Sequence, residues 1–161
     1  MTRTNVLRLL ESAGIPFEAR AYPVDENDLS GVHTARLLGL PPERLFKTLV
    51  LRGERTGIFV CCIPCAEEID LRKAATAAGD KKCEMLPMKE LLPTTGYIRG
   101  GCSPIGMKRR FPVWIDETAA LHTRIAVSAG VRGMMVLLAP EDLKAYVGAQ
   151  EADLTSLRIH R

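Results

Sequence analysis

The sequence predicts an α+β fold in which a mixed β-sheet carries helices at its periphery. Strand-like and helix-like segments follow one another without strict alternation, which argues against a doubly wound parallel sheet. The chain has 161 residues, of which 47% are hydrophobic and 25% are charged, and this composition is typical of a globular domain with its own core. We therefore expect one domain over residues 1–161.

Capping residues delimit the expected helices. Thr4, Ser30 and Asp70 are of the types that cap helix N-termini, and a glycine follows each of the three helical segments where helices commonly end. A proline opens one further helix, where its missing N–H is tolerated, and another proline closes a short one. The expected helices cover residues 6–13, 31–38, 71–78, 88–92 and 140–147.

Apolar runs bounded by glycine and proline indicate the strands. A glycine-bounded turn at residues 53–57 predicts that the two runs beside it form a hairpin. The polar tail 148–161 is typical of either a last helix or a frayed end. The expected strands cover residues 15–22, 45–52, 58–63, 82–86, 97–99, 113–116, 124–128 and 134–138.

The bulk properties argue against a membrane protein. No apolar run approaches the roughly 20 residues that cross a bilayer, and the N-terminal residues lack the apolar core of a signal peptide. The formal net charge of +3 is compatible with a polyanionic partner without requiring one. These features favour a cytoplasmic protein.

The five cysteines favour reduced thiols, because their number is odd and the chain lacks a signal peptide. Cys62 and Cys65 form a C-x-x-C motif, but no second pair supplies the further ligands that zinc needs. Cys61 and Cys62 also belong to an apolar strand, where cysteine commonly acts as a small hydrophobic residue. We expect neither a metal ion nor a cofactor.

Lys47 is unusual because it lies inside a strand of large apolar residues. Side chains alternate between the two faces of a strand, so Lys47 shares a face with Leu49 and Leu51. One interpretation is a lysine at the start of the strand whose head reaches water. The alternative is a cation on the wall of a cleft, where it holds a phosphate or polarises a carbonyl.

The segment 97–110 contains adjacent glycines, Gly100 and Gly101. Glycine allows positive φ and leaves one surface of the backbone uncovered, so amide N–H groups can meet an anion or a developing oxyanion. Ser103 adds a hydroxyl, and Pro104 stiffens the turn. The alternative interpretation is a hairpin with a solvated end.

Three consecutive cations, Lys108, Arg109 and Arg110, follow the glycine pair within the same segment. Cations beside an open backbone loop are typical of a surface that faces phosphate groups. We expect these three residues to form a patch that faces the phosphate groups of a ligand.

Several separated motifs make the sequence similar to the YbaK/EbsC family of aminoacyl-tRNA editing domains, and within it to the YbaK-type deacylases. The resemblance extends over nearly the whole chain. The motifs are Phe46-Lys47-Thr48-Leu49 and the run from Gly100 to Arg109, supported by residues 70–73, 81–85, 95–97 and 127–133.

The resemblance implies a mixed sheet, partly closed like a barrel and surrounded by helices. It implies a pocket between the lysine strand, the glycine loop and the strand that ends near Ser128. Lys47 matches the family's essential lysine, Gly100 and Gly101 match its glycine loop, and Tyr22 matches a pocket-lining tyrosine. Thr48, Ser103 and Pro104 belong to the same motifs and are expected to contact substrate.

The resemblance also implies the substrate and the chemistry. These deacylases act on Cys-tRNA(Pro) and often on Cys-tRNA(Cys), and the thiol of the substrate itself attacks the ester. The absence of an evident nucleophile beside His33, His122 or His160 agrees with that mechanism. Aminoacyl-tRNA is therefore the expected partner, and a complex with prolyl-tRNA synthetase is left open.

One position departs from the family. Relatives often carry an aspartate about where Met135 lies, and the neighbouring residues supply no carboxylate. The amino acid that is removed is open for this reason. The alternatives are a deacylase for another small residue, alanine or serine, and a non-catalytic module that binds tRNA or a synthetase.

Overall fold

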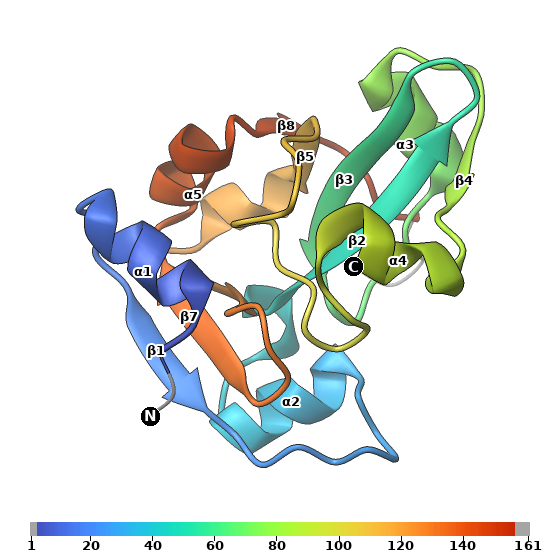
Figure 1. The fold of residues 1–161 in the computed structure, drawn as a ribbon. Coiled ribbons are helices and arrows are strands. Elements are labelled where there is room, and N and C mark those ends of the chain that lie inside the picture. The colour runs from blue at the N-terminus through green and yellow to red at the C-terminus, as the bar shows by residue number, and fades with distance from the viewer. Residues whose placement is uncertain (1–2, 157–161) are drawn as a thin grey trace.

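The computed structural model describes residues 3–156, so His160 lies outside the described residues (Figure 1). The helices are α1 (Asn5–Ser12), α2 (Gly31–Leu38), α3 (Leu71–Ala78), α4 (Met88–Thr95) and α5 (Pro140–Val147). The strands are β1 (Glu18–Ala21), β2 (Phe46–Gly53), β3 (Gly57–Pro64), β4 (Cys83–Met85), β5 (Val113–Asp116), β6 (Ile125–Ser128), β7 (Met134–Leu138) and β8 (Gln150–Ala152).

The predicted caps start three of these helices. The Thr4 and Ser30 hydroxyls accept hydrogen bonds from the backbone of α1 and α2, and the Asp70 carboxylate accepts two from the first turn of α3. Each of these bonds satisfies an N–H group that the helix itself leaves without a partner. Gly39 and Gly79 end α2 and α3 in the left-handed conformation, as their positions predict.

Two sheets form the centre of the fold. One has the order β1-β7-β6 and is antiparallel, and the other has the order β4-β2-β3-β5-β8 and pairs β5 in parallel with both of its neighbours. A parallel bridge between Leu45 and Ala126 joins the sheets where β2 begins. The prediction of a mixed α+β fold is confirmed. The two sheets do not close into a barrel, and the Leu45–Ala126 bridge is the feature that makes them partly barrel-like.

The two faces of the β2–β3 hairpin separate different parts of the core. Phe46 on one face packs with Val60 and Cys62 beneath α1 and β7. Leu51 on the other face packs with Phe59 and further apolar residues against α3. This alternation is the one that the sequence predicts for β2, and it places Lys47 on the same face as Leu51.

The prediction of a strand at residues 97–99 is wrong. The Tyr97 N–H donates to the Thr95 hydroxyl, and the Tyr97 hydroxyl donates to the Ile105 carbonyl oxygen. These contacts fold the segment back onto its own loop instead of pairing it with a sheet. Helix α4 also continues past Pro93 to Thr95, whose hydroxyl and the N–H of Gly96 donate to the carbonyls of Leu91 and Leu92.

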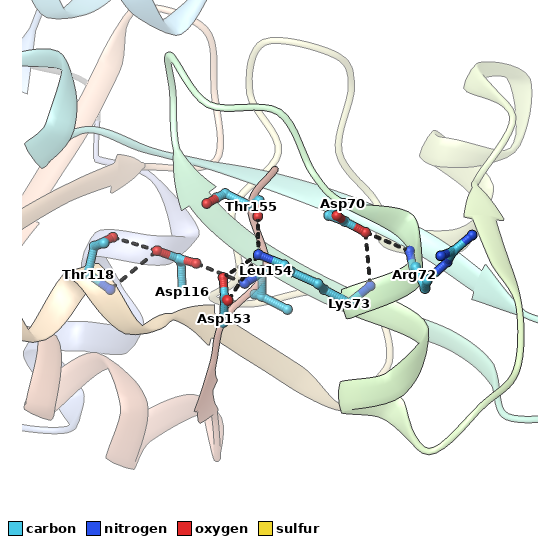
Figure 2. Close-up of polar contacts among 8 residues, drawn as sticks. All are labelled: Asp70, Arg72, Lys73, Asp116, Thr118, Asp153, Leu154 and Thr155. Atoms are coloured by element: carbon cyan, nitrogen blue, oxygen red, sulfur yellow. Dashed lines mark hydrogen bonds and ion pairs between the residues drawn. The ribbon is translucent and has the colours of Figure 1, made fainter. Parts of the chain in front are cut away.

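The tail is neither a helix nor a frayed end over residues 148–156. Its first part forms β8, which pairs in parallel with the outer edge of β5. Polar groups then fix the following residues, as Figure 2 shows. The buried Asp116 carboxylate accepts hydrogen bonds from the Leu154 N–H at 3.0 Å and from the Thr118 hydroxyl at 2.6 Å. Alternating patterns in so short a polar strand are too weak to be detected in the sequence.

Lys73 fixes the same tail from the side of α3. Its ammonium donates to the Asp153 carboxylate at 2.9 Å and to the Thr155 carbonyl at 2.8 Å (Figure 2). Residues 70–73, which belong to the family motifs, therefore serve the fold by capping α3 and holding the tail. None of the helices within residues 3–156 combines the length and apolar character needed to cross a membrane.

Asp116→Ala is expected to lower the free energy of unfolding by about 3 kcal/mol, because the buried Leu154 N–H then loses a charged acceptor. Urea denaturation followed by circular dichroism measures the change. Asp153→Ala is the matched control, since it removes a carboxylate that is 54% exposed and is expected to cost less than about 1 kcal/mol. Equal losses in the two variants would contradict the role of Asp116.

Candidate active site

A pocket of about 390 Å³ lies where one edge of β2 has no neighbouring strand. Strand β4 pairs with β2 over Leu51–Gly53, and β6 forms a single bridge to the same segment of chain, at Leu45. Between these two contacts, the β2 residues 46–50 line the pocket. An unpaired strand edge leaves backbone donors and acceptors uncovered, so this segment can bind a ligand by its main chain as well as by its side chains.

Thr48 turns its backbone toward this open edge. The Val50 carbonyl accepts from the N–H of Leu86, which follows β4. Residues two apart in a strand direct their backbone groups to the same side, so the N–H and C=O of Thr48 also face the side of the gap. The Thr48 side chain lies against Cys62, with 3.9 Å between Oγ1 and Sγ.

Lys47 brings a positive charge into the pocket. It is half-buried and lines the pocket beside Thr48. Within residues 3–156, no carboxylate lies within ion-pair distance of its ammonium group, and no Asp or Glu lines the pocket. A partly buried cation without a counter-ion is electrostatically unfavourable, so the site is suited to receive an anion or the negative end of a polarised carbonyl.

The glycine loop forms the opposite wall, but its two glycines have different positions. Gly100 lines the pocket and has φ of +85°. Gly101 faces the turn between β6 and β7, where an added Cβ would lie 3.0 Å from the Val131 carbonyl carbon and 3.1 Å from the Arg132 nitrogen. Its own N–H donates to the Ile98 carbonyl at 3.0 Å. Gly101 therefore allows two backbone segments to approach, while Gly100 faces the ligand space.

Arg132 fixes the loop in this position. Its Nε donates to the Arg99 carbonyl at 2.8 Å, and its guanidinium also pairs with Glu26 at 3.0 Å. The same side chain lies over Gly100, where an added Cβ would come within 3.2 Å of Nε. The arginine thus connects the glycine loop to the turn that follows β6 and to the segment before α2.

The remaining predicted pocket residues come from the three-stranded sheet. Ser128 at the end of β6 is paired in register with Met135 of β7, and both line the pocket. Tyr22 lies just beyond β1 and lines it too, with its N–H donating to the Gly133 carbonyl. The structure therefore brings Tyr22, Lys47, Thr48, Gly100 and Ser128 into one pocket.

Two thiols line the same pocket but are poor nucleophiles. Burial raises the pKa of the Cys102 thiol to about 12. Burial also raises the pKa of Cys65 to about 11, against the opposing attraction of the positive charge on Lys47. At neutral pH both thiols are therefore protonated.

The other predicted residues of the loop lie outside this pocket. Ser103 is fully buried, and its hydroxyl accepts from the Ile105 N–H at 3.2 Å, so it shapes the loop. Pro104, Arg109 and Arg110 line a second pocket, while Lys108 is exposed with its backbone N–H donating to the Thr95 carbonyl.

Sequence reasoning missed the part of the wall that α4 supplies. Met88 and Leu91 on that helix and Met85 just before it line the pocket, and so does Arg99. Met88 is 59% exposed, which is high for so apolar a side chain. No motif marks Met88 or Leu91, and the proximity of α4 to β2 depends on the pairing of β4 with β2.

Cys65 and Cys102 are expected to react with iodoacetamide at pH 7.5 at least about 100-fold more slowly in the native protein than in urea, because their raised pKa values reduce the thiolate fraction. Mass spectrometry of the labelled peptides measures both rates. Rapid labelling of Cys102 in the native state would instead identify it as a reactive thiol.

Known proteins are similar to this chain in both sequence and architecture. A model of aminoacyl-tRNA editing domains matches residues 30–146, more than half of the chain. EbsC of Enterococcus faecalis, named as a candidate Cys-tRNA(Pro)/Cys-tRNA(Cys) deacylase, is 46% identical over 154 residues, which cover 96% of this chain and 94% of that protein. The uncharacterised protein YwhH of Bacillus subtilis is 26% identical over 129 residues, covering 75% of this chain and 82% of that protein.

A solved structure has the same fold. The crystal structure of a candidate trans-editing enzyme for prolyl-tRNA synthetase superposes with a TM-score of 0.84 at 24% identity, covering 97% of this chain and all 100% of that one. The family that the motifs of β2 and the glycine loop indicate is thereby confirmed, and the chain belongs to the aminoacyl-tRNA editing domains.

Proposed function

We propose that this chain is a trans-acting deacylase that hydrolyses the ester of mischarged Cys-tRNA(Pro), and of Cys-tRNA(Cys) as well. The observation that carries the proposal is the Lys47 ammonium, which lines a pocket without a carboxylate partner in the described chain and shares that pocket with Gly100. The name of the EbsC relative supports the choice of a cysteinyl ester.

Positioning and charge stabilisation carry the reaction. An aminoacyl ester is already activated, so an enzyme gains most by fixing its geometry and stabilising the negative charge that develops on the carbonyl oxygen. Lys47 holds the ester carbonyl or the adjoining phosphate of the terminal nucleotide. Gly100 presents its backbone N–H to the oxyanion, whereas Gly101 supports the loop because its own N–H already donates to Ile98.

The thiol of the cysteinyl group is the nucleophile. Its sulfur loses a proton and attacks the ester carbonyl carbon, forming a C–S bond and a four-membered thiolactone. The bond between the carbonyl carbon and the ribose oxygen breaks, and that oxygen takes up a proton to regenerate the tRNA 3′ end. Water then opens the thiolactone to free cysteine. No catalytic Ser, His or Cys of the protein is needed.

The α-ammonium group of the substrate meets neutral acceptors. Met135 occupies the wall beside Ser128, and no Asp or Glu of the described residues lines the pocket. The carbonyl and hydroxyl oxygens of Thr48 and the hydroxyls of Ser128 and Tyr22 hold the amine instead. Because this binding mode uses no carboxylate, no acidic side chain competes with the substrate for the Lys47 ammonium.

The acceptor end of the tRNA lies over the loop that follows Gly100. Lys108, Arg109 and Arg110 contact its phosphates, while Ser103 and Pro104 keep the loop in shape next to the ester. A complex with prolyl-tRNA synthetase supplies the choice of tRNA, because the modest net charge of +3 gives the chain little selectivity of its own. This activity places the protein in the cytoplasm, where tRNA is charged.

Lys47→Met is expected to reduce the single-turnover rate of Cys-tRNA deacylation by about 100-fold or more, because one preorganised charge is lost. Its thermal stability should stay equal to or above that of the wild type, since the change removes an unpaired, half-buried cation. Lys81→Met, which removes an exposed lysine after α3, is the matched control. Wild-type rates in Lys47→Met would refute the proposed role.

Replacing the substrate thiol by a hydroxyl tests the mechanism directly. Cys-tRNA(Pro) is expected to be cleaved at least about 100-fold faster than Ser-tRNA(Pro) carrying the same tRNA, because the serine hydroxyl is a far weaker nucleophile at neutral pH. Thin-layer analysis of released amino acid measures both rates. Comparable rates would favour the alternative of a deacylase for small residues in general, in which water attacks.

A further inference from the structure

A second pocket, of about 250 Å³, is lined by a later part of the loop that carries Gly100 and shares no lining residue with the pocket of Lys47. It is lined by Leu9 of α1, by Tyr146 and Val147 of α5, and by most of the loop residues from Pro104 to Phe111. In the view of Figure 1, this loop passes between α1 and α5 on one side and β2 and α4 on the other. One loop therefore supplies a wall of both pockets.

The charge of this second pocket is positive. Arg109 and Arg110 line it, and no carboxylate from the described part of the chain does. Within residues 3–156, Arg109 forms no ion pair or hydrogen bond through its side chain, and both arginines are exposed. Arg110 donates to the Tyr146 carbonyl at 3.4 Å, which fixes it against the C-terminal end of α5. A guanidinium that is free of protein partners suits a phosphate group.

The apolar part of the pocket offers two aromatic rings. Phe111 and Tyr146 both line it, and both are only partly buried. In the described chain the Tyr146 hydroxyl has no hydrogen-bond partner. Aromatic side chains beside unpaired arginines are the combination with which proteins bind single-stranded nucleic acid, because bases stack on the rings while cations meet the phosphates.

We propose that the second pocket is a nucleotide subsite that takes one unpaired base and its phosphate from the single-stranded 3′ end of the RNA. The inference rests on the proposed function, which places the esterified end beside Gly100. Gly100 and Cys102 line the first pocket and Pro104 to Phe111 border the second, so an RNA strand that follows the loop reaches both. The volume of about 250 Å³ is below the roughly 300 Å³ of common ligand pockets, so the pocket takes a group no larger than about one base with its phosphate.

The test compares two substrates in the wild type and in two variants. One substrate is the cysteinyl ester of adenosine alone, and the other is the cysteinyl ester of an RNA hairpin with a four-nucleotide 3′ tail. Arg109→Gln removes the phosphate contact, and Tyr146→Leu removes a ring while keeping an apolar contact with the core. Arg55→Gln is the matched control, because Arg55 is an exposed cation in the turn between β2 and β3.

For Arg109→Gln and for Tyr146→Leu, the ratio of kcat/KM for the hairpin ester to that for the adenosine ester is expected to fall about tenfold. This fall in the ratio is expected to result from a higher KM for the hairpin ester. Arg55→Gln should leave this ratio unchanged. The slope of log affinity against log salt concentration should also fall by about 0.7 for Arg109→Gln, as loss of one phosphate contact on a single strand requires.

Binding of the uncharged hairpin, measured by fluorescence anisotropy, separates the inference from the proposed function. If the wild type cleaves neither ester, the deacylase proposal fails, while a tenfold loss of hairpin binding in both variants still supports the subsite. An unchanged ratio and unchanged binding would overturn the subsite even in an active deacylase. A loss of the same size in Arg55→Gln would also overturn it, since the effect would then be one of net charge.

Discussion

The close contact between the glycine loop and the turn after β6 is the constraint on which the site depends. Gly101 permits it, because any side chain there would strike the backbone of Val131 and Arg132. Arg132 then holds the loop through the Arg99 carbonyl. This contact brings a loop from one part of the chain against strands from another, so that Gly100 and Ser128 border the same space. Without this contact, the pocket would lose the wall that Gly100 and Cys102 supply.

The second determinant is an interruption in the sheet. Strand β2 has partners at both ends of one edge and none between, and its residues 46–50 border the pocket there. The ammonium side chain at this gap is half-buried, yet it stays accessible to a ligand. Within residues 3–156 this charge has no carboxylate partner, so it remains available to a ligand.

Local patterns predicted the caps, the hairpin and the alternation of β2, because each depends on residues near in sequence. Lys47 and the glycine pair were ambiguous individually and were identified by their joint resemblance to a family. The contribution of α4 and the difference between Gly100 and Gly101 depend on tertiary contacts that no local pattern encodes. The strand expected at Tyr97 failed for the same reason, since its hydroxyl and backbone bind within their own loop.

The burial of the two pocket cysteines has a consequence for enzyme survival. An activated ester beside a protein thiolate would transfer its acyl group to the enzyme and leave a covalent thioester, which blocks the site. Cys65 and Cys102 border the pocket, yet burial keeps both protonated at neutral pH. Because burial disfavours the thiolate form, neither cysteine attacks the activated ester readily. The packing of the site therefore protects the enzyme against self-acylation.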